Sequence, residues 1–159
     1  MPRDPRKFFD EFVKPAYEAW KRDELAEWKA KALISNLDIM AETYFRYWEH
    51  SDPSKISDAT SPRKYREHLV AHEAEDFGLI WDVHDAHKHI TLGSTRPGGR
   101  QVTQSEQTQP QSLRWGTARW GDGRWGSPEE LVITTDGGEK RSLSSVAQHV
   151  LEMWERLLQ

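Results

Sequence analysis

The chain has 159 residues, no cysteine and a formal net charge of −4, with 8 Trp, 4 Tyr and 5 Phe as large candidates for a core. This composition excludes disulfides, thiol catalysis and thiolate metal sites, and the charge argues against a protein that coats nucleic acid or an anionic membrane. Because no apolar run approaches a bilayer span and the N-terminus lacks a signal-peptide core, we expect one cytoplasmic domain over residues 1–159, without membrane contact or cofactor.

Residues 1–92 are expected to be the helical part of the fold. In residues 8–20, apolar side chains recur at steps of three and four, which predicts a helix that Pro15 kinks or splits. The same spacing in residues 25–48 predicts a second helix of about 25 residues, with Asp23 as its N-cap.

Two further helices are expected before the composition changes. Ser61, followed by Pro62, is suited to cap a third helix that is partly exposed. Gly78 marks the expected boundary to a fourth helix, which contains the stretch WDVHDAHKHITL at residues 81–92. Helices joined in this order favour an antiparallel bundle.

Residues 93–141 are expected to form a loop and β insertion, and residues 142–159 a closing helix. The part at 93–112 is rich in Gly, Gln, Ser and Thr, which is typical of a mobile excursion or of weak edge strands. In residues 129–143, an apolar β-branched run, an Asp-Gly turn and a short return predict a hairpin, and a Ser cap begins the last helix. The expected fold class is therefore mainly α (α+β): an antiparallel helical bundle with a small antiparallel β-hairpin or sheet inserted before the C-terminal helix.

The stretch at residues 81–92 combines three His, two Asp and one Lys. On a helix, several of these polar side chains share one face, while His87 lies on a neighbouring apolar face with Val83. Carboxylates beside an imidazole fix its tautomer and raise its basicity, as a general base or a metal-bound His requires. Alternatively, the His-Lys-His end is a structural helix C-terminus that the helix dipole favours. The candidate binding residues are Asp82, Asp85, Lys88 and His89.

Arg-Trp-Gly triplets repeat every five residues between positions 114 and 126, within a locally cationic segment. A stacking ring beside a guanidinium and a flexible Gly suits unpaired bases or an anionic partner. An odd period, however, alternates the Trp side chains between the two faces of a strand, and Arg over Trp equally forms intramolecular cation–π packing. The residues concerned are Arg114, Trp115, Arg119, Trp120, Arg124 and Trp125.

His68 and His72 have the i, i+4 spacing that places two imidazoles on one side of a helix, with Glu73 and Glu75 as nearby carboxylates. Leu69 follows His68 at the position where a zincin has Glu, so that mechanism is absent. No metal site is expected, with His68 and His72 as the weak candidates.

The segment Asp82-x-x-Asp85-Ala86-x-Lys88-His89, followed by a polar loop, LVITTDGG and a final helix, resembles a broad group of uncharacterised bacterial proteins. Those proteins have a helical front half that ends in Asp-x-x-Asn/Asp-Ala-x-Lys-His, then a β excursion and a last helix. The resemblance implies a bacterial protein of the same layout and brings no established activity.

The helical half is also similar to the HEPN superfamily, which includes RNases and nucleotide-transfer partners in toxin–antitoxin and phage-defence systems. Their motif is Arg, four to six residues and then His on a late helix, with a dimer joining two such sites. Arg63 to His68 and Arg66 to His72 satisfy this spacing, although neither Arg is followed by the usual Asn, Asp or His. The resemblance implies a metal-independent ribonuclease in which Arg66 positions phosphate, His72 acts as acid or base, and the RNA 2′-hydroxyl is the nucleophile.

The expected function is that of a small binding or regulatory module. Its expected surface joins the end of the helix with Asp82 and His89 to the Arg-Trp-Gly segment, with a protein or single-stranded RNA as partner and a homodimer as one expected assembly. A HEPN-type ribonuclease or toxin/defence component is the first alternative. A metal-dependent hydrolase with His and carboxylate ligands is the second, and whether the chain is an enzyme stays open.

Overall fold

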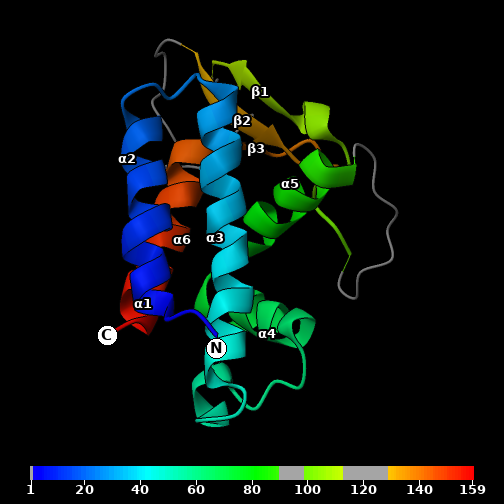
Figure 1. Ribbon diagram of the computed structural model, residues 1–159. Coiled ribbons are helices and arrows are strands. Elements are labelled where there is room, and N and C mark those ends of the chain that lie inside the picture. The colour runs from blue at the N-terminus through cyan, green and yellow to red at the C-terminus, as the bar shows by residue number, and fades with distance from the viewer. Residues whose placement is uncertain (1, 90–98, 113–128) are drawn as a thin grey trace.

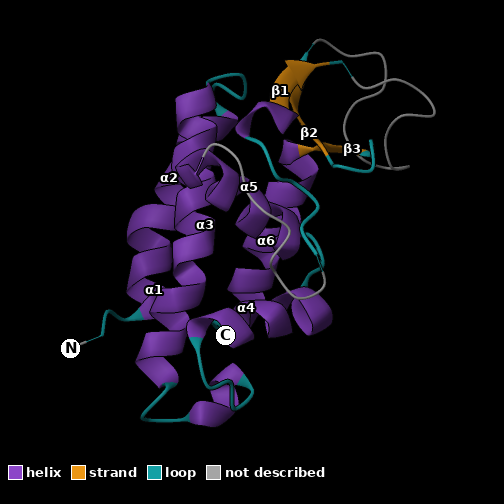
Figure 2. Cartoon of the chain, turned by 90° about the vertical axis from the view of Figure 1, so that its right-hand side faces the viewer, coloured by secondary structure: helices purple, strands orange, loops and turns teal. Residues whose placement is uncertain are grey.

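The computed structural model describes residues 2–89, 99–112 and 129–159. Helices form most of these ranges, and a small antiparallel sheet lies at one end of the bundle (Figures 1 and 2). The mainly α class, with a β element inserted before the last helix, is therefore confirmed. None of the helices in the described ranges combines the length and the apolarity that a bilayer crossing requires.

The first expected helix is a helical segment in three parts. α1 (Pro5–Phe8) begins at Asp4, whose carboxylate accepts hydrogen bonds from two backbone N–H groups of the first turn, at 2.8 and 3.2 Å. A π-helical turn, η1 (Phe9–Val13), then leads into α2 (Lys14–Lys21). Pro15 lies in the first turn of α2, so the expected interruption takes the form of a change in helical type just before it.

The long helix α3 (Glu27–Trp48) begins later than expected, and its N-cap is Ala26. The assignment of Asp23 as the N-cap is therefore wrong. The indole N–H of Trp20 donates to the carbonyl oxygen of Glu24 at 3.0 Å, and the N–H of Ala26 donates to the carbonyl of Asp23 at 3.0 Å. These bonds hold the connection in turns, so regular helix starts only after them.

The third expected helix starts where the sequence indicates. The Ser61 hydroxyl accepts the backbone N–H of Lys64 at 3.2 Å and caps α4 (Pro62–His68), after the short 3₁₀ turn η2 (Pro53–Ile56). A π-helical turn, η3 (Leu69–Glu73), follows, and three residues separate it from α5 (Phe77–His89). Gly78 is thus the second residue of α5, and the expected boundary is confirmed to within two residues. A Cβ at Gly78 would meet Val70 at 3.4 Å, which is an ordinary van der Waals contact.

The expected hairpin is present as the larger part of a three-stranded sheet. β2 (Glu130–Thr134) pairs with β3 (Lys140–Ser142), and the turn between them places Gly138 at a φ of +83°. The 3₁₀ turn η4 (Ser105–Gln107) leads into β1 (Thr108–Gln111), which pairs with the other edge of β2 and is the expected edge strand. α6 (Leu143–Leu157) follows β3 directly, and the Ser142 hydroxyl caps it.

The core is built around α3, which packs against the other long helices (Figure 1). Tyr44 of α3 stacks on Tyr65 of α4, with ring centroids 5.7 Å apart, and its ring lies 5.9 Å from that of Trp154 of α6. The buried Trp154 indole also donates to the carbonyl of Leu37 at 3.2 Å. Since buried aromatic rings carry large apolar areas, this cluster ties three helices together.

Candidate functional site

The two carboxylates expected on the polar face of α5 hold the chain that folds back over it. Asp82 is 0% exposed and accepts the backbone N–H of Gln101 at 2.7 Å. Asp85 accepts a hydrogen bond from Nη1 of Arg100 at 2.9 Å. The expected polar stripe is therefore buried in part, because Arg100 and Gln101 bind its carboxylates and helical periodicity does not show these contacts.

Lys88 and His89 are exposed at the C-terminal end of α5, and neither forms an ion pair with another described residue. The Arg-Trp-Gly triplets at 114–126 lie outside the described residues. The surface expected to join α5 to these triplets therefore stays a prediction.

Arg66 lies in a nearly buried ion pair. Its Nε and Nη2 atoms each donate to the Asp38 carboxylate of α3 at 3.0 Å, and the two side chains are 12% and 5% exposed. His84 of α5 lies close to the same carboxylate, with Nε2 3.8 Å from Asp38 Oδ2 and Nδ1 3.2 Å from the Ser35 hydroxyl. Asp38 thus pairs with the guanidinium of Arg66, to which the ribonuclease hypothesis assigns phosphate binding.

His68 and His72 do come together, with ring centroids 4.8 Å apart. His68 Nε2 lies 2.9 Å from the Ser57 hydroxyl and 3.9 Å from a Glu73 carboxylate oxygen. Within residues 2–89, 99–112 and 129–159, no group of three His, Asp or Glu side chains has a geometry that could hold a metal ion. Glu73 is instead paired with Arg156 of α6 at 2.9 Å.

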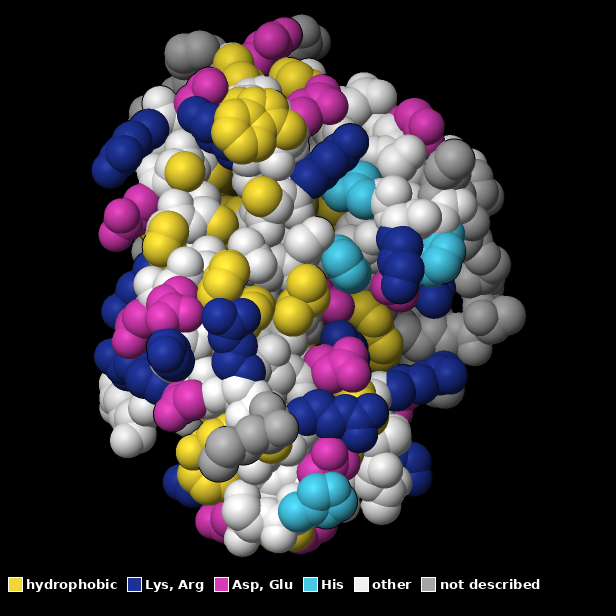
Figure 3. Space-filling view, in the orientation of Figure 1, with side chains coloured by type: hydrophobic (Ala, Val, Ile, Leu, Met, Phe, Trp, Pro, Cys, Tyr) yellow, Lys and Arg dark blue, Asp and Glu magenta, His cyan; other side chains and the backbone are white. Residues whose placement is uncertain are grey.

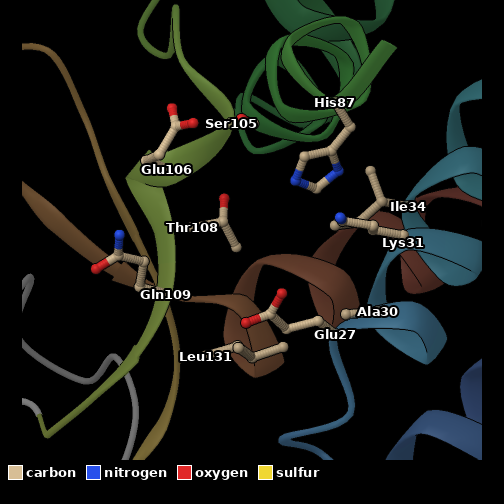
Figure 4. Close-up of a pocket in the computed structure, with 10 residues that line it drawn as sticks. All are labelled: Glu27, Ala30, Lys31, Ile34, His87, Ser105, Glu106, Thr108, Gln109 and Leu131. Carbon is tan, nitrogen blue, oxygen red and sulfur yellow. The ribbon is translucent and has the colours of Figure 1, made fainter. Parts of the chain in front are cut away.

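A pocket of about 230 Å³ opens between α3, α5, η4, β1 and β2 (Figure 4). Its floor is formed by the apolar side chains of Ala30, Ile34 and Leu131, which are at most 2% exposed. A buried apolar floor below a polar rim is typical of small-molecule sites. The rim residues are Glu27, Lys31, His87, Ser105, Glu106, Thr108 and Gln109.

His87 enters this pocket from α5, beside Lys31 of α3 (Figure 4). Burial, the charge of Lys31 and the neighbouring His84 together lower the pKa of His87 to about 4. The imidazole is therefore neutral at pH 7, with one nitrogen as hydrogen-bond donor and the other as acceptor. Figure 3 shows His side chains gathered over α5, on the face where it lies beside α3.

Glu27 and Lys31 stand one turn apart on α3 and do not pair. This i, i+4 arrangement commonly forms an ion pair, as Arg6 and Asp10 do at 3.2 Å. Neither Glu27 nor Lys31 makes an ion pair or side-chain hydrogen bond within the described chain. In Figure 4, both side chains point toward the cavity. Their charges are therefore open to a bound molecule.

Thr108 also lines the pocket, but its hydroxyl oxygen is turned away from solvent. Its Oγ1 atom is buried and has no hydrogen-bond partner among the described residues. Such groups are rare in folded proteins and cost stability. The Thr108 hydroxyl is therefore a candidate for stabilising substitution, whereas Glu27 and Lys31 are exposed and reachable by a bound molecule.

Most of the pocket was not predicted from the sequence. Glu27 and Lys31 lie in the second expected helix, where no role was assigned to them, and His87 was placed on an apolar face. The assignment of this face is correct for Ile80 and Val83, which are 0% and 1% exposed. The one feature of the sequence that could have indicated the pocket is a titratable His on an otherwise apolar helical face.

Comparison of the chain with family models, curated proteins and solved structures finds no match. The geometry of the pocket is thus the ground for a functional conclusion. Among its described lining residues, no hydrogen bond joins a hydroxyl nucleophile to a base.

Proposed function

We propose that the chain is a small binding module whose ligand is a small polar molecule held in the pocket between α3, α5 and β1. The observation that carries this proposal is the convergence of Glu27, Lys31 and His87 above a buried apolar floor. Each of these side chains lacks a hydrogen-bond or ion-pair partner in the described chain. A pocket with convergent polar groups and a perturbed pKa is the usual form of a binding site.

The test is a thermal-shift screen against a panel of single polar compounds: amino acids, short carboxylic acids, polyols and nucleobases. A ligand at about 100 times its Kd adds about 2.7 kcal/mol to the free energy of unfolding. For a domain of this size, that corresponds to a rise in Tm of about 5–10 °C. We expect at least one compound to produce such a rise.

The variant His87→Leu locates the binding site, and His89→Leu on the same helix is its matched control, because His89 is exposed and outside the pocket. His87→Leu should fold normally, since Val83 and Ala86 around it are buried apolar residues. We expect it to abolish the thermal shift, whereas His89→Leu should keep it. A panel without any hit, or a hit that binds both variants equally, contradicts the proposal.

A further inference from the structure

We propose that the pocket recognises a zwitterion of the α-amino acid class, with its carboxylate toward Lys31 and His87 and its ammonium toward Glu27. The ligand's side chain then lies on the floor formed by Ala30, Ile34 and Leu131. This inference rests on the proposed function and names its ligand. Three observations support it: the separation of two opposite charges, the charge balance of the rim, and the size and polarity of the cavity.

The first observation is the separation of Glu27 and Lys31. They are spaced for an ion pair on α3, yet both side chains reach into the cavity without pairing (Figure 4). A molecule with a positive and a negative group on neighbouring atoms satisfies both charges at once. A purely anionic ligand would leave Glu27 facing like charge, and a purely cationic ligand would do the same to Lys31.

The second observation is the charge balance of the rim. One Lys and two Glu line the pocket, and His87 is neutral at pH 7, so the rim carries a net charge of −1. This balance disfavours phosphates and dicarboxylates, which bring two or more negative charges. Neutral His87 still serves a carboxylate, because its ring N–H is a hydrogen-bond donor next to the Lys31 ammonium.

The third observation is the size and polarity of the cavity. An apolar cavity of about 150 Å³ holds benzene, so about 230 Å³ suits a molecule of about nine non-hydrogen atoms. A mid-sized amino acid such as leucine has this size. The charged groups lie on the rim, and the buried floor is apolar, which matches a charged head group with an aliphatic or otherwise compact side chain.

The experiment is calorimetric titration of the full chain at pH 7 with each of the standard L-amino acids. The amino acid that binds most tightly is then compared with its α-amide, which lacks the carboxylate, and with its des-amino acid, which lacks the ammonium. Hydrogen bonds to charged groups are strong, so we expect each analogue to bind about tenfold to a hundredfold more weakly. Equal affinity of either analogue overturns the inference.

Two variants assign the charges. Lys31→Ala should weaken the amino acid about tenfold but not the amide, whose ammonium is relieved of a like charge. Glu27→Gln should likewise weaken the amino acid about tenfold but not the des-amino acid. Lys64→Ala and Glu18→Gln are matched controls, because both residues are exposed and lie outside the pocket. A control variant that weakens binding as much as its pocket counterpart overturns the assignment.

The two proposals fail in different ways. If a compound that is not a zwitterion binds in a His87-dependent manner and no amino acid does, the pocket is a binding site and the amino acid inference is wrong. If neither the amino acids nor the wider panel bind, both proposals are wrong.

Discussion

A buried ion pair between Asp76 and Arg141 joins the start of α5 to the sheet, and its removal tests how much it stabilises the fold. The Asp76 carboxylate accepts hydrogen bonds from Nη1 and Nη2 of Arg141 in β3, at 2.9 and 3.0 Å. The two side chains are 8% and 4% exposed. His149 of α6 also contacts Asp76 through Nδ1. One carboxylate thus connects α5, β3 and α6.

The variant Asp76→Asn keeps the shape of this side chain and removes its charge. Removal of one partner from a buried ion pair costs about 3–5 kcal/mol, because the other charge stays in a poorly solvated place. The His149 contact adds little, since that side chain is 53% exposed and surface pairs contribute about 0–1 kcal/mol. We therefore expect Asp76→Asn to lower the free energy of unfolding by about 3 kcal/mol.

Urea unfolding followed by tryptophan fluorescence measures this loss, with an unchanged m-value as the sign that the same two states are compared. The control is Glu67→Gln, which removes an exposed i, i+4 pair with Arg63 and should cost less than about 1 kcal/mol. Replacing both buried partners, with Asp76→Asn and Arg141→Met together, should recover part of the loss. A single variant within about 1 kcal/mol of the wild type would show that the pair is solvated.

The stabilisation by the Asp76 carboxylate should depend on pH. Burial by itself raises the pKa of Asp76, but the hydrogen bonds from Arg141 and His149 outweigh it and hold the pKa below the usual value of 3.8. A lowered folded-state pKa means that the stabilisation is present above about pH 4 and is lost as the pH falls through the folded value. The difference in unfolding free energy between wild type and Asp76→Asn should therefore shrink in acid. A difference that stays constant down to pH 2 refutes this reasoning.

Four further predictions concern the pocket, the last helix and RNA. The pKa of His87 is about 4 in the folded protein and 6.5 in the unfolded chain. The free energy of unfolding of the wild type should therefore be highest above pH 6.5 and fall by about 2–3 kcal/mol toward pH 4. Urea titrations should show a smaller fall for His87→Leu. Thr108→Val should raise Tm, with a gain of about 1 kcal/mol, since it removes a buried hydroxyl without a described partner, and a lower Tm would mean that the hydroxyl is satisfied. Ser142→Ala should cost about 1 kcal/mol through loss of the α6 cap, with Ser144→Ala near wild type in the same unfolding assay. When total RNA is incubated with the protein, with or without chelator, gel electrophoresis should show intact RNA. Cleavage that resists the chelator and is lost in His72→Ala would instead favour the ribonuclease hypothesis.

Features of the fold that depend on neighbours in sequence were predicted well. The three-and-four spacing identified the helices, the Asp-Gly turn identified the β2–β3 hairpin, and Ser61 caps α4 as expected. Asp23 failed as a cap because the buried Trp20 indole donates to the Glu24 carbonyl four residues later, which holds this connection in turns until α3 starts. Gly78 marks the start of α5 to within two residues, as expected.

The pocket depends on residues that are far apart in the sequence. Glu27 and Lys31 come from α3 and His87 from α5, whereas Thr108 and Leu131 come from the sheet. The polar segment before β1 gave no indication that it would return to the N-terminal half of α3. No local pattern therefore brings these groups together, and only the tertiary fold does.

α5 shows why the stretch richest in His and Asp was a poor guide to the pocket. Amphipathic reasoning sends polar side chains to solvent and apolar ones to the core. On this helix the carboxylates of Asp82 and Asp85 are covered by residues 99–101 and bind Gln101 and Arg100. His87, placed on the apolar side, sits where the core meets the sheet and faces the pocket. Substitution of Asp82 or Asp85 should therefore be read out as lost stability, whereas substitution of His87 should leave the fold intact and remove binding.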